Sequence, residues 1–213
     1  MATDYTTLTA RLRVLANDTA TSNPVYADTP DGTRDGSNVL FKLHNTNIVA
    51  GSLYRTYGTT VRSTAGFTPD LPSGYVTLGA APDNGVTQPF FFDYYFQWYV
   101  DADYAAFIDA ATVDVGEVAG SLPAGTLYAA VVQYALDYYW QRRSSDWANK
   151  YASAGGGASS QAQTPAQAYL KLAEKARKTG DALLAAARTS FGKTKSPFSG
   201  TTTLLIDPGS PRR

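Results

Sequence analysis

Few side chains of this sequence could carry out acid–base or nucleophilic chemistry. The 213 residues include one histidine, His44, and no cysteine. A histidine that acts as a general base needs an orienting carboxylate and a nucleophile beside it, and the segment FKLHNTN around His44 identifies neither. We therefore interpret His44 as a turn or surface residue. The lack of cysteine excludes disulfide frameworks, thiolate metal sites and thiol nucleophiles, and a single histidine excludes a zinc site with several histidines.

The acidic residues have two arrangements that could bind a metal ion. Asp101 and Asp103 could hold Mg²⁺ or act as an acid–base pair. At the start of a predicted helix, however, they are better explained as capping residues that accept free backbone N–H groups. Asp28, Asp31 and Asp35 resemble spaced calcium ligands, but the glycine and the bidentate glutamate of an EF-hand loop are missing. Calcium is the weaker alternative, and we expect no metal ion and no cofactor.

Two glycine-containing segments match phosphate-binding loops only in part. Gly155–Gly157 follows no predicted strand and precedes no Gly-Lys-Ser/Thr sequence. Gly192–Thr194 matches the last three residues of a P-loop, but Ala187 stands where the first glycine is required. Because neither a nucleophile–base–orienter set nor a metal set can be assembled, we do not expect an enzyme.

The net charge of zero is the sum of two unequal parts. Residues 1–141 hold 6 basic and 14 acidic side chains, a balance of −8, whereas residues 142–213 hold 12 basic and 4 acidic ones, a balance of +8. Such asymmetry indicates an acidic or polyanionic partner, or head-to-tail association of copies. Solvated basic faces on the C-terminal helices would give the same pattern.

A basic face is predicted on the C-terminal helices. It comprises five cationic side chains: Arg142, Arg143, Lys171, Lys175 and Lys178. The three lysines are four and three residues apart, so they share one side of a helix. This face would suit nonspecific contact with DNA phosphates or contact with an acidic partner, and a solvated surface is the alternative.

Helical spacing of apolar residues occurs at both ends of the chain. It covers residues 6–17 and resumes at Asp101, at Pro123 and at Pro165. Gly180 interrupts the last of these segments and indicates a kink or a cap there.

Strands are predicted between the first helix and the others. Short runs of β-branched and aromatic residues, separated by turn sequences, predict an antiparallel β module of about five strands over 38–99. The segment 18–37 is rich in Pro, Gly, Asp, Ser and Thr and predicts a loop. A flexible link is predicted over 153–164.

The segregation of helices and strands predicts an α+β fold. Residues 1–37 and 100–191 would form a small helical bundle, with the antiparallel β module (38–99) inserted into it. Residues 192–213 would form an extended C-terminal arm. Its single apolar run, Leu204–Ile206 (Leu204, Leu205, Ile206), could add a strand to a sheet edge, and Arg212 and Arg213 end the chain.

The densest aromatic feature is the run at 90–99 (FFFDYYFQWY). Because both faces of such a strand are aromatic, the second face needs a cover from helices, from another copy or from a ligand. We favour burial between subunits over a carbohydrate-binding platform.

No apolar run approaches the roughly 20 residues that span a bilayer. The start MATDYTTLTA also lacks the basic and apolar regions of a signal peptide. We expect a protein assembled in a cytosol, with no membrane partner.

Three strings together resemble one known family. They are FKLHNTNIVAGSLYRTYG, GYVTLGAAPDNG and FDYYFQWYVDADYAAFIDAA. Their pattern and order, with a first helix that carries leucine and arginine, resemble the head-to-tail connector (adaptor) proteins of tailed bacteriophages. The likeness covers roughly residues 5–190 and includes no catalytic signature.

The resemblance implies a structural protein of the virion, located at the head–tail junction and assembled in the host cytoplasm. It implies a ring of about twelve copies that docks on the portal protein, contacts the next neck or tail protein and surrounds the channel through which the genome is ejected. A terminal arm would reach a neighbouring ring or portal subunit. Two alternatives are another neck component, such as a stopper or tail-completion protein, and a tail or baseplate component with an aromatic glycan-binding surface.

Overall fold

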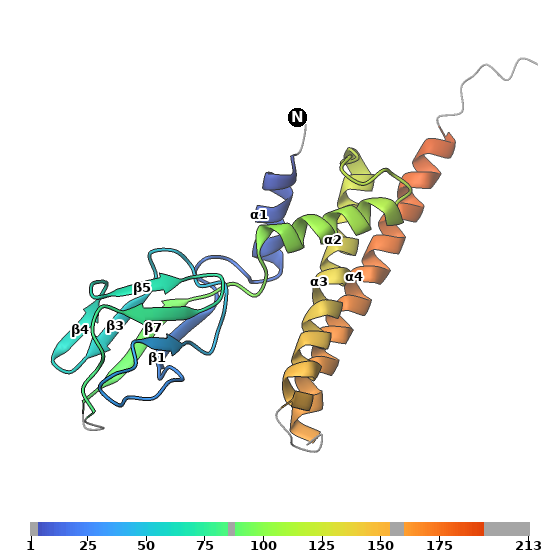
Figure 1. Ribbon diagram of the computed structural model, residues 1–213. Helices are drawn as coiled ribbons and strands as arrows, with labels where there is room; N and C mark the ends of the chain where they lie inside the picture. The colour runs from blue at the N-terminus through green and yellow to red at the C-terminus, as the bar shows by residue number, and fades with distance from the viewer. Residues whose placement is uncertain (1–3, 85–87, 154–159, 194–213) are drawn as a thin grey trace, which may run out of the picture.

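The computed structural model describes residues 4–84, 88–153 and 160–193 (Figure 1). In these ranges it has four helices and two antiparallel sheets with seven strands, which confirms the α+β class. Figure 1 shows the strands beside the helices rather than among them. The predicted arm falls almost entirely outside the described residues, and with it Leu204, Leu205, Ile206, Arg212 and Arg213.

The helices share one hydrophobic core. They are α1 (Tyr5–Leu15), α2 (Asp101–Asp114), α3 (Gly125–Ser153) and α4 (Ser160–Lys193). The Asp4 carboxylate begins α1 by accepting the Thr7 N–H at 2.7 Å, and Leu8 and Leu12 follow at helical spacing and are fully buried. Because α1 packs on α2 and α3, the first helix and the helices after the β module share the same core.

The long helices α3 and α4 lie side by side as a hairpin (Figure 1). α4 begins at Ser160, within the predicted flexible link, and it runs without interruption through Gly180. The predicted alternative of a helix cap at Gly180 was therefore wrong. A Cβ added at Gly180 would lie 2.9 Å from the ring of Tyr134 in α3, so the glycine permits close approach of the two helices.

The strands form two sheets. They are β1 (Pro24–Asp28), β2 (Leu40–Lys42), β3 (Tyr54–Tyr57), β4 (Thr60–Ser63), β5 (Phe67–Asp70), β6 (Tyr75–Leu78) and β7 (Phe90–Tyr95). One sheet has the order β1-β7-β3-β4 and the other β2-β6-β5. β7 pairs with β1 on one side and β3 on the other, with Tyr94 opposite Val25 and Phe90 opposite Tyr57.

The first strand lies where a loop was predicted. β1 occupies part of the segment 18–37, so the β module begins at Pro24 rather than at residue 38. Its pairing with β7 and the packing of Val25 on the sheet core stabilise it despite the turn-forming residues around it.

The aromatic run at 90–99 is largely buried inside the chain. Phe90, Phe92, Tyr94 and Phe96 point into a second hydrophobic core, to which the other sheet contributes Phe41, Val76 and Leu78 and the residue after β2 contributes Leu43. These four rings lie on one face of the strand. Phe91 and Tyr95 on its other face are half-buried, and the expectation that another copy covers that face stays a prediction. The same burial removes the four rings from any glycan-binding surface.

Candidate functional site

Three lysines form an exposed face on α4, which we call the lysine face: Lys171, Lys175 and Lys178. The packing side of α4 carries Ala173 and Ala176, which are buried, whereas the three lysines are exposed. The sequence spacing had predicted this shared side.

The lysines of this face differ in their partners. Lys178 Nζ lies 2.8 Å from a Glu174 carboxylate oxygen, and this hydrogen bond and ion pair raise the pKa of Lys178 and lower that of Glu174. Among the described residues, Lys171 and Lys175 make no ion pair. Leu172 beside them is 42% exposed. The lysine face is thus a positive surface with unneutralised charge.

The two arginines predicted to share this face lie elsewhere. Arg142 pairs with Asp103 of α2 at 3.1 Å. Arg143 is buried, with its guanidinium between the rings of Trp98 and Tyr169. The prediction of a single basic face with five members is therefore wrong for Arg143, because aromatic rings from two other segments enclose it.

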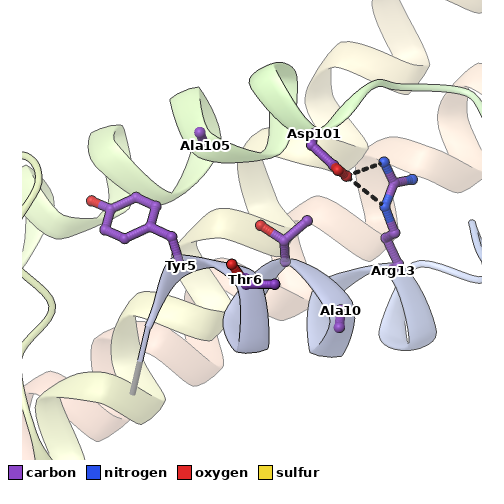
Figure 2. A pocket seen from close by; sticks show the side chains of 7 residues that line it. Tyr5, Thr6, Ala10, Arg13, Asp101 and Ala105 are labelled. Atoms are coloured by element: carbon purple, nitrogen blue, oxygen red, sulfur yellow. Dashed lines mark hydrogen bonds and ion pairs between the residues drawn. The ribbon is translucent and has the colours of Figure 1, made fainter. Parts of the chain in front are cut away.

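A groove of about 420 Å³ separates α1 from α2 (Figure 2). Its lining is mostly small or polar: Tyr5, Thr6, Thr9, Ala10, Arg13, Asp101 and Ala105. At one end the Tyr5 hydroxyl donates to Asp109 at 2.5 Å, and at the other the Arg13 guanidinium donates to Asp101 at 2.7 Å. Within this groove the only carboxylate, that of Asp101, is paired with an arginine, so the lining offers no nucleophile–base pair.

The paired acids at the start of α2 have separate structural roles. The Asp103 carboxylate accepts the Val100 N–H at 3.2 Å, which confirms capping for this residue. Asp101 caps no backbone N–H in the described structure and instead joins α2 to α1 through Arg13. The capping prediction was therefore half right.

His44 does have an orienting carboxylate, which sequence reasoning missed. Its Nδ1 contacts Asp28 Oδ1, and its backbone N–H donates to Asp28 Oδ2 at 3.2 Å. The Tyr94 hydroxyl also donates to Asp28, at 2.5 Å, and desolvation followed by this bond raises the pKa of Tyr94. The His44 Nε2 lies 3.7 Å from Asp31, and His44 is about half exposed. This cluster ties β1 to the segment after β2.

The three acids considered as calcium ligands do not converge. Asp28 is occupied by His44 and Tyr94, whereas Asp35 caps its own turn by accepting the N–H groups of Ser37 and Asn38, both at 2.8 Å. In the part of the chain that the structure describes, no three His, Cys, Asp or Glu side chains are placed to hold a metal ion.

Of the two glycine motifs, only the second lies among the described residues. Gly155–Gly157 lies outside the described residues. Gly192 and Lys193 are the last residues of α4, whereas a P-loop glycine and lysine precede a helix.

Two chain segments connect the β module to the helices, and we call them the joint: residues 16–23, between α1 and β1, and residues 96–100, between β7 and α2 (Figure 1). They are hydrogen-bonded to each other through the Phe96 N–H and the Asn23 carbonyl, at 3.2 Å. Sequence reasoning singled out no residue of the first segment.

The carboxylate of Asp18 is fully buried at the centre of the joint. One oxygen accepts the Trp98 N–H at 2.8 Å and the Asn23 side-chain amide at 3.2 Å. The other accepts the Tyr104 hydroxyl at 3.0 Å and lies 3.4 Å from an Arg13 guanidinium nitrogen. Burial raises the pKa of the Asp18 carboxyl, and these donors oppose that shift.

Trp98 connects this carboxylate with both hydrophobic cores. Its ring packs edge-to-face on Phe96 of the β module, with 4.7 Å between ring centroids, and also packs on the helical core. Its indole N–H donates to the Asn23 side-chain oxygen at 3.2 Å. The joint is therefore a packed, hydrogen-bonded structure.

In the ranges that the structure covers, no helix is long and apolar enough to cross a membrane. Comparison of the chain with known protein families, with curated proteins and with solved structures finds no match.

Proposed function

We propose that this chain is a structural head-to-tail connector of a tailed bacteriophage. It would form a ring of about twelve copies on the portal, join the capsid to the tail at the head–tail junction and surround the DNA channel without carrying out catalysis. The observation that carries this proposal is the construction of one helical core from α1 and α2–α4 around an inserted β module. The resemblance in the sequence implies the same order of elements.

Ring formation requires two different surfaces that meet head to tail. α4 packs along α3, whereas α1 packs on α2 and α3, so the lysine face and the α1–α2 groove belong to different helices of the bundle (Figure 1). The groove is flanked by two carboxylates, that of Asp101, which is paired with Arg13, and that of Asp109, which accepts the Tyr5 hydroxyl. Contact between these two surfaces in neighbouring copies would explain the division of the chain into an acidic and a basic part.

Mass photometry of the purified chain, alone and with portal rings, tests this function. We expect large closed assemblies, either spontaneously or on the portal. The double variant Lys171→Glu/Lys175→Glu should shift the population toward monomers, because it replaces two exposed positive charges with negative ones. The matched control Lys171→Arg/Lys175→Arg keeps the charge and should assemble normally. A chain that stays monomeric with and without portal contradicts the proposal.

The second candidate for the lysine face is the DNA of the channel. Unneutralised lysines bind phosphates without reading sequence, and such binding weakens steeply with salt. If the Lys→Glu double variant still forms rings but loses salt-dependent retention on duplex DNA, then the lysine face lines the channel and another surface makes the ring contact.

The arm is the proposed link to the portal or to a neighbouring copy. Removing residues 193–213 should abolish stable portal docking while the rest of the chain stays folded. Unchanged docking of the truncated chain would exclude this role for Leu204–Ile206 and for the terminal arginines.

A further inference from the structure

The geometry points to Asp18 as the residue that fixes the orientation of the β module relative to the helices. Its carboxylate binds the two segments of the joint to each other. Loss of that carboxylate should therefore make the angle between the β module and the helices variable, while each of these two units stays folded. This inference is independent of the proposed connector function.

The first step of the argument is the position of Asp18. It belongs to the segment 16–23, yet its carboxylate accepts the backbone N–H of Trp98, which is in the segment 96–100. Its backbone carbonyl accepts from the Gln97 side chain at 3.4 Å, in the same second segment. The residue therefore joins the only two segments that connect the described strands to the described helices.

The second step is the surroundings of the carboxylate. The charged group that faces it is Arg13 of α1, and the titratable groups are Tyr104 of α2 and Tyr139 of α3. All of its hydrogen-bonding neighbours are donors, and its exposed fraction is 0%. A fully buried site that contains only donors requires an acceptor, and a carboxylate is the side chain that accepts at both oxygens.

The third step is that each unit has a core of its own. The helical core and the sheet core are separate clusters, and Trp98 is the partly buried residue that packs against both. Asp18 contacts the helical core only through polar groups, the Tyr104 hydroxyl and the Tyr99 N–H, and contributes no apolar surface to either cluster. Its removal should therefore leave both cores intact and weaken the connection between them.

The test uses the full chain and takes advantage of its lack of cysteine. Spin labels at Thr60→Cys in β4 and Ala182→Cys in α4, both exposed positions, report the distance between the units by pulsed electron paramagnetic resonance. A second pair, Thr60→Cys and Thr77→Cys, lies within the β module. Dilution with unlabelled protein removes distances between copies.

The Asp18→Asn variant keeps the size of the side chain but places an N–H₂ group against donors. We expect the distribution between units to broaden and shift, and the distribution within the β module to stay as in the wild type. Asp101→Asn is the matched control: it removes a carboxylate from the same Arg13, but from a side chain that is 82% exposed, and it should change neither distribution.

Two results would overturn the inference. One is an unchanged distribution between units in Asp18→Asn. The other is broadening within the β module as well, since Asp18 would then be needed for the fold and not for the angle.

Discussion

The guanidinium carbon of Arg143 lies 3.4 Å from the centroid of the Trp98 ring and 4.9 Å from that of Tyr169. The arginine thus connects α3 with α4 and with the joint while only 5% of it is exposed. Buried cation–π contacts are worth about 2 kcal/mol or more. We expect Arg143→Met to lower the free energy of unfolding by about that amount in urea titrations.

Two further variants serve as controls for this prediction. Arg143→Lys should recover little stability, because an ammonium group lacks the flat surface that stacks on two rings. Arg188→Met, at an exposed position of α4, should have almost no effect. Equal losses in Arg143→Met and Arg188→Met would show that the stacking contributes nothing.

Gly180→Ala should destabilise the chain although alanine favours helices. The substitution gains about 1 kcal/mol of helix propensity, but its Cβ would lie 2.9 Å from the Tyr134 ring, which is buried and hydrogen-bonded to Asp181 at 2.7 Å. Overpacking of this kind costs about 1 to 3 kcal/mol. Thr179→Ala, at the exposed neighbouring position, has no such contact and should raise the melting temperature slightly. A rise in both variants would contradict close α3–α4 packing at Gly180.

Alanine substitutions at Gly74 and Gly51 distinguish the cost of backbone strain from the cost of steric overlap. Their φ values are +74° and +76°, so alanine at either position would adopt a left-handed conformation, which destabilises the folded state by about 1 kcal/mol. A Cβ at Gly74 would also overlap the carbonyl oxygen of Asn45, whereas the space around Gly51 is open. Gly74→Ala should therefore lose roughly 2 kcal/mol more than Gly51→Ala in chemical denaturation. Equal losses would mean that the Asn45 segment moves away at no cost.

Asp4 and Asp18 should titrate on opposite sides of the ordinary aspartate pKa of about 3.9. The Thr7 N–H lowers the pKa of Asp4, so its stabilising contribution is present above the unfolded-state value and disappears as the pH falls through the folded-state value. Burial raises the pKa of Asp18, so its ionisation costs the folded state stability at high pH, and that cost disappears as the pH falls.

Carboxyl ¹³C chemical shifts followed through an acid titration check these directions. We expect the Asp18 midpoint above the Asp4 midpoint, and Asp4→Asn to reduce the loss of stability on acidification. A midpoint for Asp18 below that of Asp4 would mean that its hydrogen-bond donors outweigh burial.

Local patterns predicted the helices well, because their determinants lie close together in the sequence. Leu8 and Leu12 are one helical turn apart, and the three lysines of the lysine face follow the spacing of α4. The strand β1 could not be predicted in this way. Its residues Pro24 and Asp28 favour turns, and its stability comes from pairing with β7, far along the chain.

The joint was missed for the same reason. Asp18 resembles any loop aspartate in the sequence, since Trp98 and Tyr104 are 80 and 86 residues away. In the sequence Arg143 resembles a surface residue. It is enclosed in the structure because Trp98, from another segment, packs against it. His44 and Asp28 are closer in sequence, 16 residues apart, but their contact was missed because β1, which ends at Asp28, was not recognised as a strand.

Because one helical core is built from both ends of the chain, α1 cannot pack until the later helices have been synthesised. α1 leaves the ribosome first, yet Leu8 and Leu12 pack against helices that end more than a hundred residues later. At about 5 to 20 residues per second, this helix waits for several seconds or longer, during which the complete β module can fold. The first helix to be made is thus buried only after α2 and α3 have been synthesised, and its leucines are available to a chaperone throughout that interval.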